Sequence, residues 1–132
     1  MRTILKSPEV APTAKFFSQG VRVGDTIYVS GQVAFDKDGA LVGKGDMRAQ
    51  TRMVMENIKS VLAQSNATID DIVKVTMFIT DMSKADQARE VRMEYFAMNP
   101  PASTGVEVKA LAHPDLLIEI EAIAVLTGRG TP

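Results

Sequence analysis

The chain has 132 residues, an apolar content of 45% and a formal net charge of −1, which predict a globular protein with a single domain over residues 1–132. It has no cysteine, which excludes disulfides, thiolate metal ligands and a cysteine nucleophile. The balanced charge argues against nucleic acid as the main partner. No apolar run is long enough to span a membrane, and the N-terminus lacks a signal-peptide core, so we expect a cytoplasmic protein.

The first third of the chain predicts an extended arm or irregular lead-in followed by a β-hairpin. Residues 1–15 contain two prolines and mixed polarity. The strand patterns of residues 16–23 and 26–34 are joined at Gly24-Asp25, which is typical of a two-residue hairpin turn. Gly31 indicates a bulge or a close backbone approach. Residues 36–39 (Asp-Lys-Asp-Gly) are interpreted as a plain turn, because the later ligands of a calcium loop are missing.

The middle of the chain predicts two helices separated by a strand. The first runs from the N-cap Asp46 to Asn66. Residues 72–80 alternate as a strand, with four apolar side chains on one face: Val73, Val75, Met77 and Ile79. A capping box at residues 83–86 opens the second helix, and residues 99–101 (Asn-Pro-Pro) end it. Its expected core face is made of Ala88, Val91, Tyr95 and Met98.

Two further strands, residues 105–111 and 117–125, complete a β-β-α-β-α-β-β order. This order predicts an α+β fold with two helices packed on one face of a mixed β-sheet. The last strand is apolar on both faces, whereas two helices can cover only one of them. A second copy of the chain is the simplest cover for the other face, so we expect a homo-oligomer.

The last strand also carries two carboxylates, Glu119 and Glu121, on one face among apolar neighbours. Burial and the like-charged neighbour should raise the pKa of at least one of them, which suits a general acid or base. Glu119 is the main candidate for catalysis or ligand contact. The alternative is a structural pair with an arginine at a subunit interface.

Other polar residues are weaker candidates. His113 is the only histidine, so no multi-histidine metal site is available, and its place before a proline indicates a surface turn. Arg89 and Arg92 lie three residues apart on the second helix and share a face, where either can bind a carboxylate. The alternative is a solvated charged face shared with Glu90 and Glu94.

Several stretches together resemble the RidA/YjgF family of reactive-intermediate deaminases, from about Phe16 to Val125. They are residues 24–32 (GDTIYVSGQ), 50–51 (QT), 56–57 (EN), 71–82 (DIVKVTMFITDM), 101–102 (PA), 106–108 (VEV) and 118–125 (IEIEAIAV). The resemblance implies a fold similar to the small trimeric chorismate mutases, with clefts between the subunits of a homotrimer. It also implies hydrolysis of small enamines and imines, such as 2-iminopropanoate, to a keto acid and ammonia without metal or organic cofactor.

The same resemblance implies the site residues. Glu119 corresponds to the glutamate that positions or activates water, and Ser30 to a serine of the cleft. The family's carboxylate-binding arginine corresponds to Ser103, its cleft cysteine to Gly105, and its first-strand tyrosine to Phe17. Serine offers one neutral hydroxyl where a guanidinium offers two charge-assisted hydrogen bonds. The usual 2-imino-acid activity is therefore expected to be weak, unless Arg89, Arg92 or Arg52 supplies the charge.

Three functions remain open at this point. The first is enamine or imine hydrolysis, with Glu119 acting on water and Ser30, Ser103 or Thr104 orienting the substrate. The second is a trimer that binds a small molecule in the same clefts with little catalysis. The third is an endoribonuclease or translation inhibitor, which the sequence pI of about 5.8 disfavours.

Overall fold

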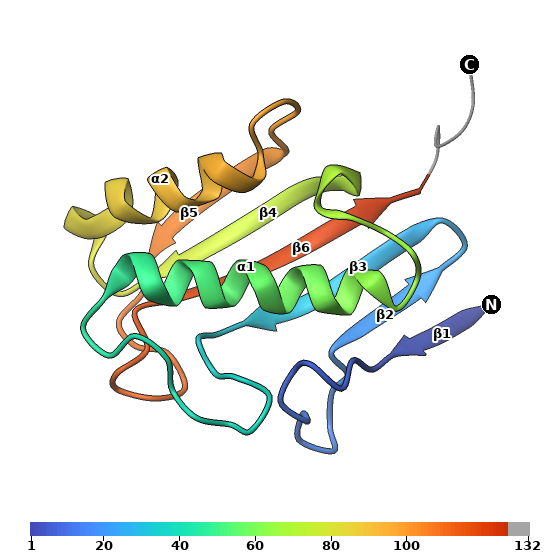
Figure 1. Cartoon of the computed structure of the whole chain (residues 1–132), viewed down its shortest axis with the longest axis horizontal. Helices are drawn as coiled ribbons and strands as arrows, with labels where there is room; N and C mark the ends of the chain where they lie inside the picture. The colour runs from blue at the N-terminus through green and yellow to red at the C-terminus, as the bar shows by residue number, and fades with distance from the viewer. Residues whose placement is uncertain (127–132) are drawn as a thin grey trace.

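The computed structural model describes residues 1–126, so the last six residues of the predicted domain lie outside the described part (Figure 1). Short 3-10 turns lie at Ile69–Asp71 and Met82–Lys84. The helices and strands follow in the order β1 (Arg2–Leu5), β2 (Gly20–Val23), β3 (Thr26–Gln32), α1 (Met47–Ala63), β4 (Ile72–Ile79), α2 (Ala85–Tyr95), β5 (Ala102–Glu107) and β6 (Ile118–Val125).

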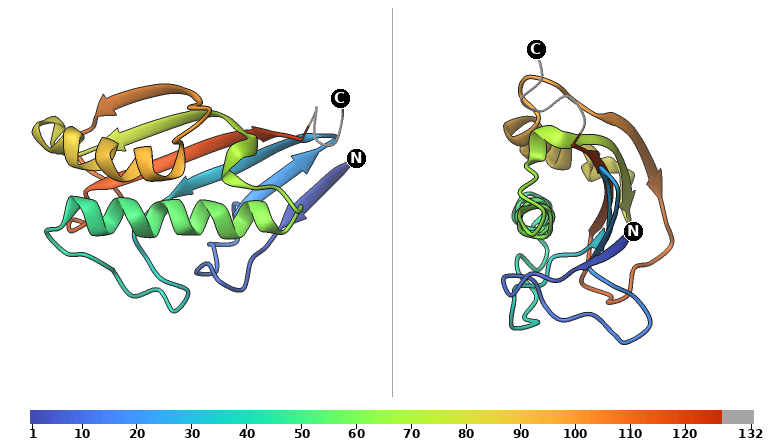
Figure 2. Two further views of the ribbon diagram at one scale, coloured as in Figure 1. Left: turned by 45° about the horizontal axis from the view of Figure 1, so that its top comes forward. Right: turned by 90° about the vertical axis from the view of Figure 1, so that its right-hand side faces the viewer.

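The strands form one mixed sheet in the order β1-β2-β3-β6-β4-β5. Among the described strands, only β4 and β5 pair in parallel, across the crossover that contains α2; the other neighbours are antiparallel. Both helices lie on the same face of this sheet, and within residues 1–126 the opposite face carries no helix (Figure 2). The predicted α+β class, with two helices on one face of a mixed sheet, is therefore confirmed.

The core lies between the helices and the sheet. The predicted stripe of α1 is fully buried: Thr51, Val54, Met55, Ile58, Val61 and Leu62. On β6, residues 118, 120, 122 and 124 face the helices and are buried, as the alternating pattern predicts. Asp46 caps α1 as expected, because its carboxylate accepts the Ala49 amide hydrogen bond at 3.0 Å. No helix in residues 1–126 has the length and apolar content needed to cross a membrane.

The N-terminal prediction was wrong in two respects. Residues 2–5 were expected to lie in an extended arm or irregular lead-in outside the sheet, but they form the edge strand β1 against β2. The strand expected at residues 16–23 starts only at Gly20, because the preceding segment folds around the buried side chain of Gln19. That amide accepts from the Ser7 backbone at 2.6 Å and donates to the Ser7 carbonyl at 3.3 Å. Pairing partners distant in the chain thus decide the ends of both strands.

The hairpin turn at Gly24-Asp25 is confirmed by the pairing of Val23 with Thr26. Strand β3 ends at Gln32, two residues before its predicted end, since its register against β6 shifts between Val29 and Gln32. The predicted face of β4 was wrong at Val73, because a second register shift lies between Ile72 and Lys74. It turns Val73 away from the helices, and this side chain is 47% exposed.

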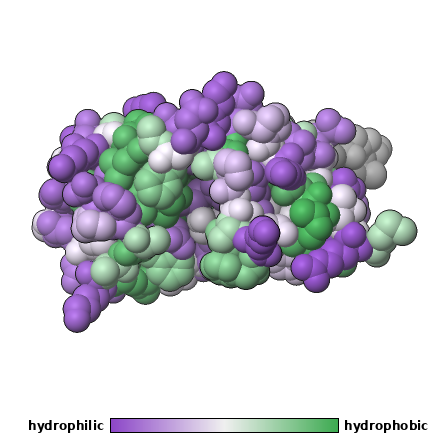
Figure 3. Space-filling model, turned by 90° about the horizontal axis from the view of Figure 1, so that it is seen from below, coloured by the Kyte–Doolittle hydropathy of each residue, from purple (hydrophilic) through white to green (hydrophobic). Residues whose placement is uncertain are grey.

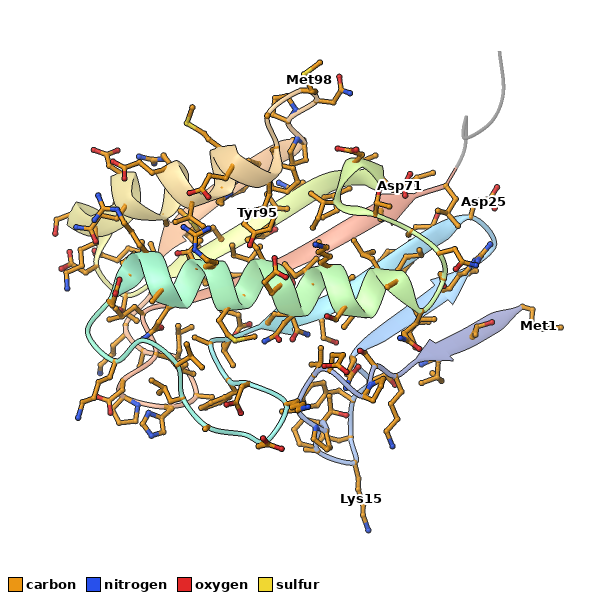
Figure 4. The ribbon with its side chains drawn as sticks, viewed as in Figure 1. Met1, Lys15, Asp25, Asp71, Tyr95 and Met98 are labelled. Carbon is orange, nitrogen blue, oxygen red and sulfur yellow. The ribbon has the colours of Figure 1, made fainter. Side chains whose placement is uncertain are left out.

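The second helix differs from its prediction at both ends. The capping box is absent, because Asp81 accepts from the amide of Ser83 and starts a 3-10 turn before α2 begins at Ala85. The helix ends at Tyr95, four residues before Asn99. Met98 was expected on the core face, but it points outward from the loop after α2 and is 83% exposed (Figure 4).

The strand predicted at residues 105–111 lies earlier, at Ala102–Glu107. Its register follows β4, with Val75 opposite Ser103 and Ile79 opposite Glu107, so β4 and not the local pattern sets its limits. All six residues of β5 are exposed within one chain.

We expect the Gln50→Leu substitution to destabilise the protein by about 2 to 4 kcal/mol, because it leaves buried backbone groups without partners. Gln50 is fully buried; its amide donates to the carbonyls of Gly43 and Asp115 and accepts from the Leu117 amide. These bonds fix the entry to β6. Urea unfolding measures the effect. The exposed Gln64 serves as control, since a Gln64→Leu change should alter stability by less than about 0.5 kcal/mol.

Candidate functional site

Glu119 lies on β6, on the face of the sheet that the helices leave open, directly beside the bulge in β3. The side chain of a residue larger than glycine at position 31 would overlap the Glu119 carboxylate. Gly31 therefore lets the carboxylate lie against the backbone, as the predicted close approach requires. On the neighbouring strand β4, Phe78 is the residue paired with Glu119.

The environment of Glu119 favours the protonated form. Its side chain is half-buried, and burial raises the pKa of the carboxyl above its ordinary value, with a further contribution from the charge of Glu121. Among residues 1–126, neither glutamate lies within ion-pair distance of a cation. The predicted arginine pair is thus not formed inside one chain.

The carboxylate of Glu119 lines a cavity of about 320 Å³. The remaining wall is mostly apolar and comes from the end of β3, from α1 and from nearby loops: residues 10–14, Phe17, residues 31–33, Phe35, Asn57 and Ala112. Figure 3 views the molecule from the side of these loops and shows apolar side chains at the surface between polar ones. A carboxylate in an apolar, partly enclosed space is suited to move a proton.

Asn57 supports this cavity from α1, and sequence reasoning did not single it out as a site residue. Asn57 is 2% exposed, and its side-chain amide donates to the carbonyls of Val33 and Phe35. These bonds hold the chain after β3 against α1, and the amide oxygen has no hydrogen-bond partner among the described residues. The available signal was a polar side chain between Val54 and Val61 on the buried stripe of the helix.

Ser30 lies on the same open face as Glu119 but lines a different cavity, of about 360 Å³, with Tyr28, Lys74 and Glu121. Its hydroxyl donates to the Ser18 carbonyl, which fixes the loop before β2. Thr104 points to this face as well, where Lys74 donates to its hydroxyl at 2.6 Å.

The remaining candidates gather at the other edge of the sheet. Arg89, Arg92 and Ser103 line a third cavity of about 320 Å³ between α2 and β5. The Arg92 guanidinium donates through Nη2 to the Ser103 hydroxyl at 2.9 Å. Gly105 lies two residues after Ser103 on β5, where an added Cβ would contact the side chain of Met77.

Within the described residues, the predicted site residues do not share one cavity. Glu119 and Phe17 line one cavity, Ser30 lines a second, and Ser103 lines a third with the two arginines of α2. Thr104 and Gly105 line none of the three. Arg52 is not available as a ligand cation, because both of its terminal nitrogens bind Glu94. His113 is exposed in its turn and accepts from the Asp115 amide.

The raised pKa of Glu119 predicts a pH-dependent cost in stability. The Glu119 carboxyl binds its proton more tightly in the folded state than in the unfolded chain. The stabilisation that this proton gives is fully present below the ordinary pKa of 4.5 and is lost as the pH rises through the raised pKa, where the buried charge lowers the stability of the protein. We expect Glu119→Gln to be more stable than the wild type above this window. Below it the difference should shrink. Urea unfolding on both sides of the window measures it; equal stability at every pH would contradict the assigned environment.

The comparisons with known proteins agree with the fold and identify its family. The sequence profile of the endoribonuclease L-PSP family matches residues 8–126. A RutC family protein of Pyrococcus abyssi is 43% identical over 108 residues, which cover 82% of this chain and 84% of that protein. The structure of a conserved Rid family protein from Yersinia pestis has a TM-score of 0.90 at 35% identity, covering 96% of this chain and 100% of its own.

A structure with a bound amino acid is also similar. E. coli TdcF with bound serine has a TM-score of 0.88 at 29% identity and covers 95% of this chain and 99% of its own. The family profile and these identities extend over most of the chain. The protein therefore belongs to the endoribonuclease L-PSP family, the group that includes the RidA/YjgF proteins.

Proposed function

We propose that this protein is a cytoplasmic homotrimer that hydrolyses a small enamine or imine to a carbonyl compound and ammonia, with Glu119 acting on water. The observation that carries the proposal is the half-buried Glu119 carboxylate in a mostly apolar cavity, with no cation beside it among residues 1–126. Such a carboxylate has a raised pKa and accepts a proton more readily than one in water. Family membership supports a deaminase-like or small-molecule-binding role.

The reaction divides into proton transfers that Glu119 can serve. An enamine first takes a proton from solvent on carbon and becomes an iminium ion. Glu119 then accepts a proton from water while the water oxygen bonds to the iminium carbon and the carbon–nitrogen π pair moves to nitrogen, giving a neutral tetrahedral amino alcohol. The same carboxyl returns the proton to nitrogen, the carbon–nitrogen bond breaks, and ammonia leaves. The hydroxyl then loses its proton to solvent as the carbonyl forms, which replaces the proton taken in the first step. Water is the only co-reactant, and Glu119 ends in its starting state.

Assembly follows from the open face of the sheet. Exposed apolar side chains lie on this face at Tyr28 and Val106, and half-buried Phe78, Ile123 and Val125 lie between them. Leaving this surface in water is unfavourable, and a second copy of the chain covers it. Clefts between subunits would also bring together residues that one chain keeps in separate cavities.

A second function is favoured by a specific observation, namely that a relative, E. coli TdcF, binds serine. A trimer that only binds an amino acid or keto acid would need the cavity but no proton transfer by Glu119. The name of the family suggests RNA cleavage as a third activity. The sequence pI of about 5.8 gives an RNA backbone little attraction.

One assay separates these functions. A serine lyase generates 2-aminoacrylate continuously, and its decay is followed with and without this protein. We expect the protein to accelerate the release of pyruvate and ammonia. No acceleration at stoichiometric protein would overturn the hydrolase and leave the binding function. Cleavage of a single-stranded RNA in a parallel sample would favour the third activity.

A further inference from the structure

Arg92 is a half-buried cation whose hydrogen-bond partners are neutral. Its guanidinium donates to the Ser103 hydroxyl at 2.9 Å and approaches the Met77 sulfur at 3.9 Å. The Nε atom is buried and has no hydrogen-bond partner among residues 1–126. A guanidinium has five donors, so most of its hydrogen-bonding capacity is unused.

The other arginines of the two helices differ from Arg92. Arg48 pairs with Glu90 at 2.8 Å, Arg52 pairs with Glu94 at 2.9 Å, and Arg89 pairs with Asp86 at 3.1 Å. Glu90 and Glu94 lie on the same helix as Arg92, yet both are engaged by arginines of α1. Among the helix arginines of residues 1–126, the three exposed ones thus have acidic partners and the half-buried Arg92 has none.

This arrangement has an electrostatic cost that an anion would remove. Burial, and to a lesser degree the charge of Arg89, holds the pKa of Arg92 below its usual range. Because arginine stays protonated at any physiological pH, the positive charge persists at this position. An anion in contact with it would supply the missing charge-assisted hydrogen bonds.

The cavity in front of Arg92 matches a small carboxylate with an apolar group. Its charged end is formed by Arg89, Arg92 and the Ser103 hydroxyl. The other walls are apolar and come from Met93, Phe96, Pro100 and Pro101. The volume of about 320 Å³ holds a compound of a few carbon atoms with its water. A planar guanidinium binds a carboxylate through two parallel hydrogen bonds.

We propose that Arg92, reaching from α2 to Ser103, is the residue of this protein that binds the carboxylate of a small ligand. The proposal rests on the hydrolase function proposed above and names a residue that holds its substrate. The guanidinium comes from α2 and lies on the same side of β5 as the Ser103 hydroxyl. This cavity shares no lining residue with that of Glu119 in one chain, so the two side chains act on one ligand only if neighbouring subunits bring the cavities together.

Calorimetry with pyruvate and with its amide tests the carboxylate site directly. The wild type should bind pyruvate more tightly than the amide. Arg92→Gln should weaken pyruvate binding about 10- to 150-fold, as expected for lost charged hydrogen bonds, and leave the amide nearly unchanged. Arg48→Gln is the control, because Arg48 is an exposed helix arginine that pairs with Glu90 and lines none of the three cavities described above; its effect should be less than about 3-fold.

A relocated arginine separates loss of binding from loss of folding. In the double variant Arg92→Gln with Ser103→Arg, the guanidinium comes from β5 and should restore pyruvate affinity to within about 10-fold of the wild type. Restoration shows that the cation, and not the integrity of α2, determines affinity. No restoration, in a variant that melts like the wild type, overturns the proposal, as does unchanged affinity in Arg92→Gln.

The outcome for this site is distinct from that for the hydrolase. If pyruvate binding depends on Arg92 but 2-aminoacrylate is not consumed, the carboxylate site stands and hydrolysis fails. If Arg92→Gln hydrolyses 2-aminoacrylate with unchanged KM and kcat, hydrolysis stands and the carboxylate site fails. A wild type that binds neither pyruvate nor its amide overturns the carboxylate site.

Discussion

Replacing Glu119 by glutamine is expected to lower kcat for imine hydrolysis by about 10²- to 10⁴-fold, the usual contribution of a positioned general base. The amide has nearly the same shape and leaves Gly31 and Phe78 undisturbed, but it cannot accept a proton from water. Pyruvate affinity should change by less than about 10-fold, because the proposed carboxylate contact lies at Arg92. Steady-state kinetics and calorimetry on the same preparation measure both.

The matched control for this substitution is Glu121→Gln. Glu121 lies two residues further on β6, on the same face, and loses the same charge. It lines the cavity of Ser30 and not that of Glu119, so kcat should fall by less than about 10-fold. Light scattering should give both variants the mass of three 14.3 kDa chains. Equal losses in the two variants, or dissociation of Glu119→Gln to unfolded monomers, would assign Glu119 a structural role.

Mixing two inactive variants is expected to restore activity. Glu119→Gln subunits retain Arg92, and Arg92→Gln subunits retain Glu119. If each cleft takes one residue from each of two neighbouring subunits, every mixed trimer has one intact cleft. Refolding an equal mixture at random should then recover about a quarter of the wild-type activity, since three-quarters of the trimers are mixed and one cleft in three is intact.

The same mixture gives no activity if Glu119 and Arg92 act within one chain. A mixture of native trimers that are not allowed to exchange subunits is the control and should stay inactive. Mixing Glu119→Gln with Glu119→Gln/Arg92→Gln should also give none, because no cleft regains its carboxylate. Activity in that last mixture would remove Glu119 from the mechanism.

The features that the sequence predicted well depend on short-range patterns. The stripe of α1 and the alternation of β6 are set by the periods of a helix and a strand, and both lie in the core as predicted. Gly31 was recognisable because glycine inside a strand pattern has few explanations, and the adjacent Glu119 supplies one of them.

The features that the sequence missed depend on pairing across the chain. Strand β1 forms because it can pair with the free edge of β2, and the polarity pattern of residues 2–5 does not predict this pairing. The limits of β5 are set by β4, almost 30 residues earlier, and not by its own alternation. Val73 faces outward because of a bulge opposite β6. Local propensity carries no information on such partners.

The candidate site divides in the same way. Glu119 stood out in the sequence as a carboxylate in an apolar strand. Arg89 and Arg92 could not be distinguished there, because they share a helix face and a charge. What separates them is tertiary: Arg89 has Asp86 beside it, and Arg92 lies behind β5 with Ser103.

Strand β5 gives this protein a way to change its ligand without endangering its fold. None of its six residues is buried in one chain, and it carries Ser103 and Gly105, two of the three positions at which the resemblance to the RidA family implies a changed site residue. Substitutions on an exposed edge strand usually alter stability little. Alternate residues of β6, by contrast, are core residues, so this strand tolerates few changes beside Glu119. Under the function proposed above, selection can thus vary specificity on β5 while Glu119 stays fixed on β6.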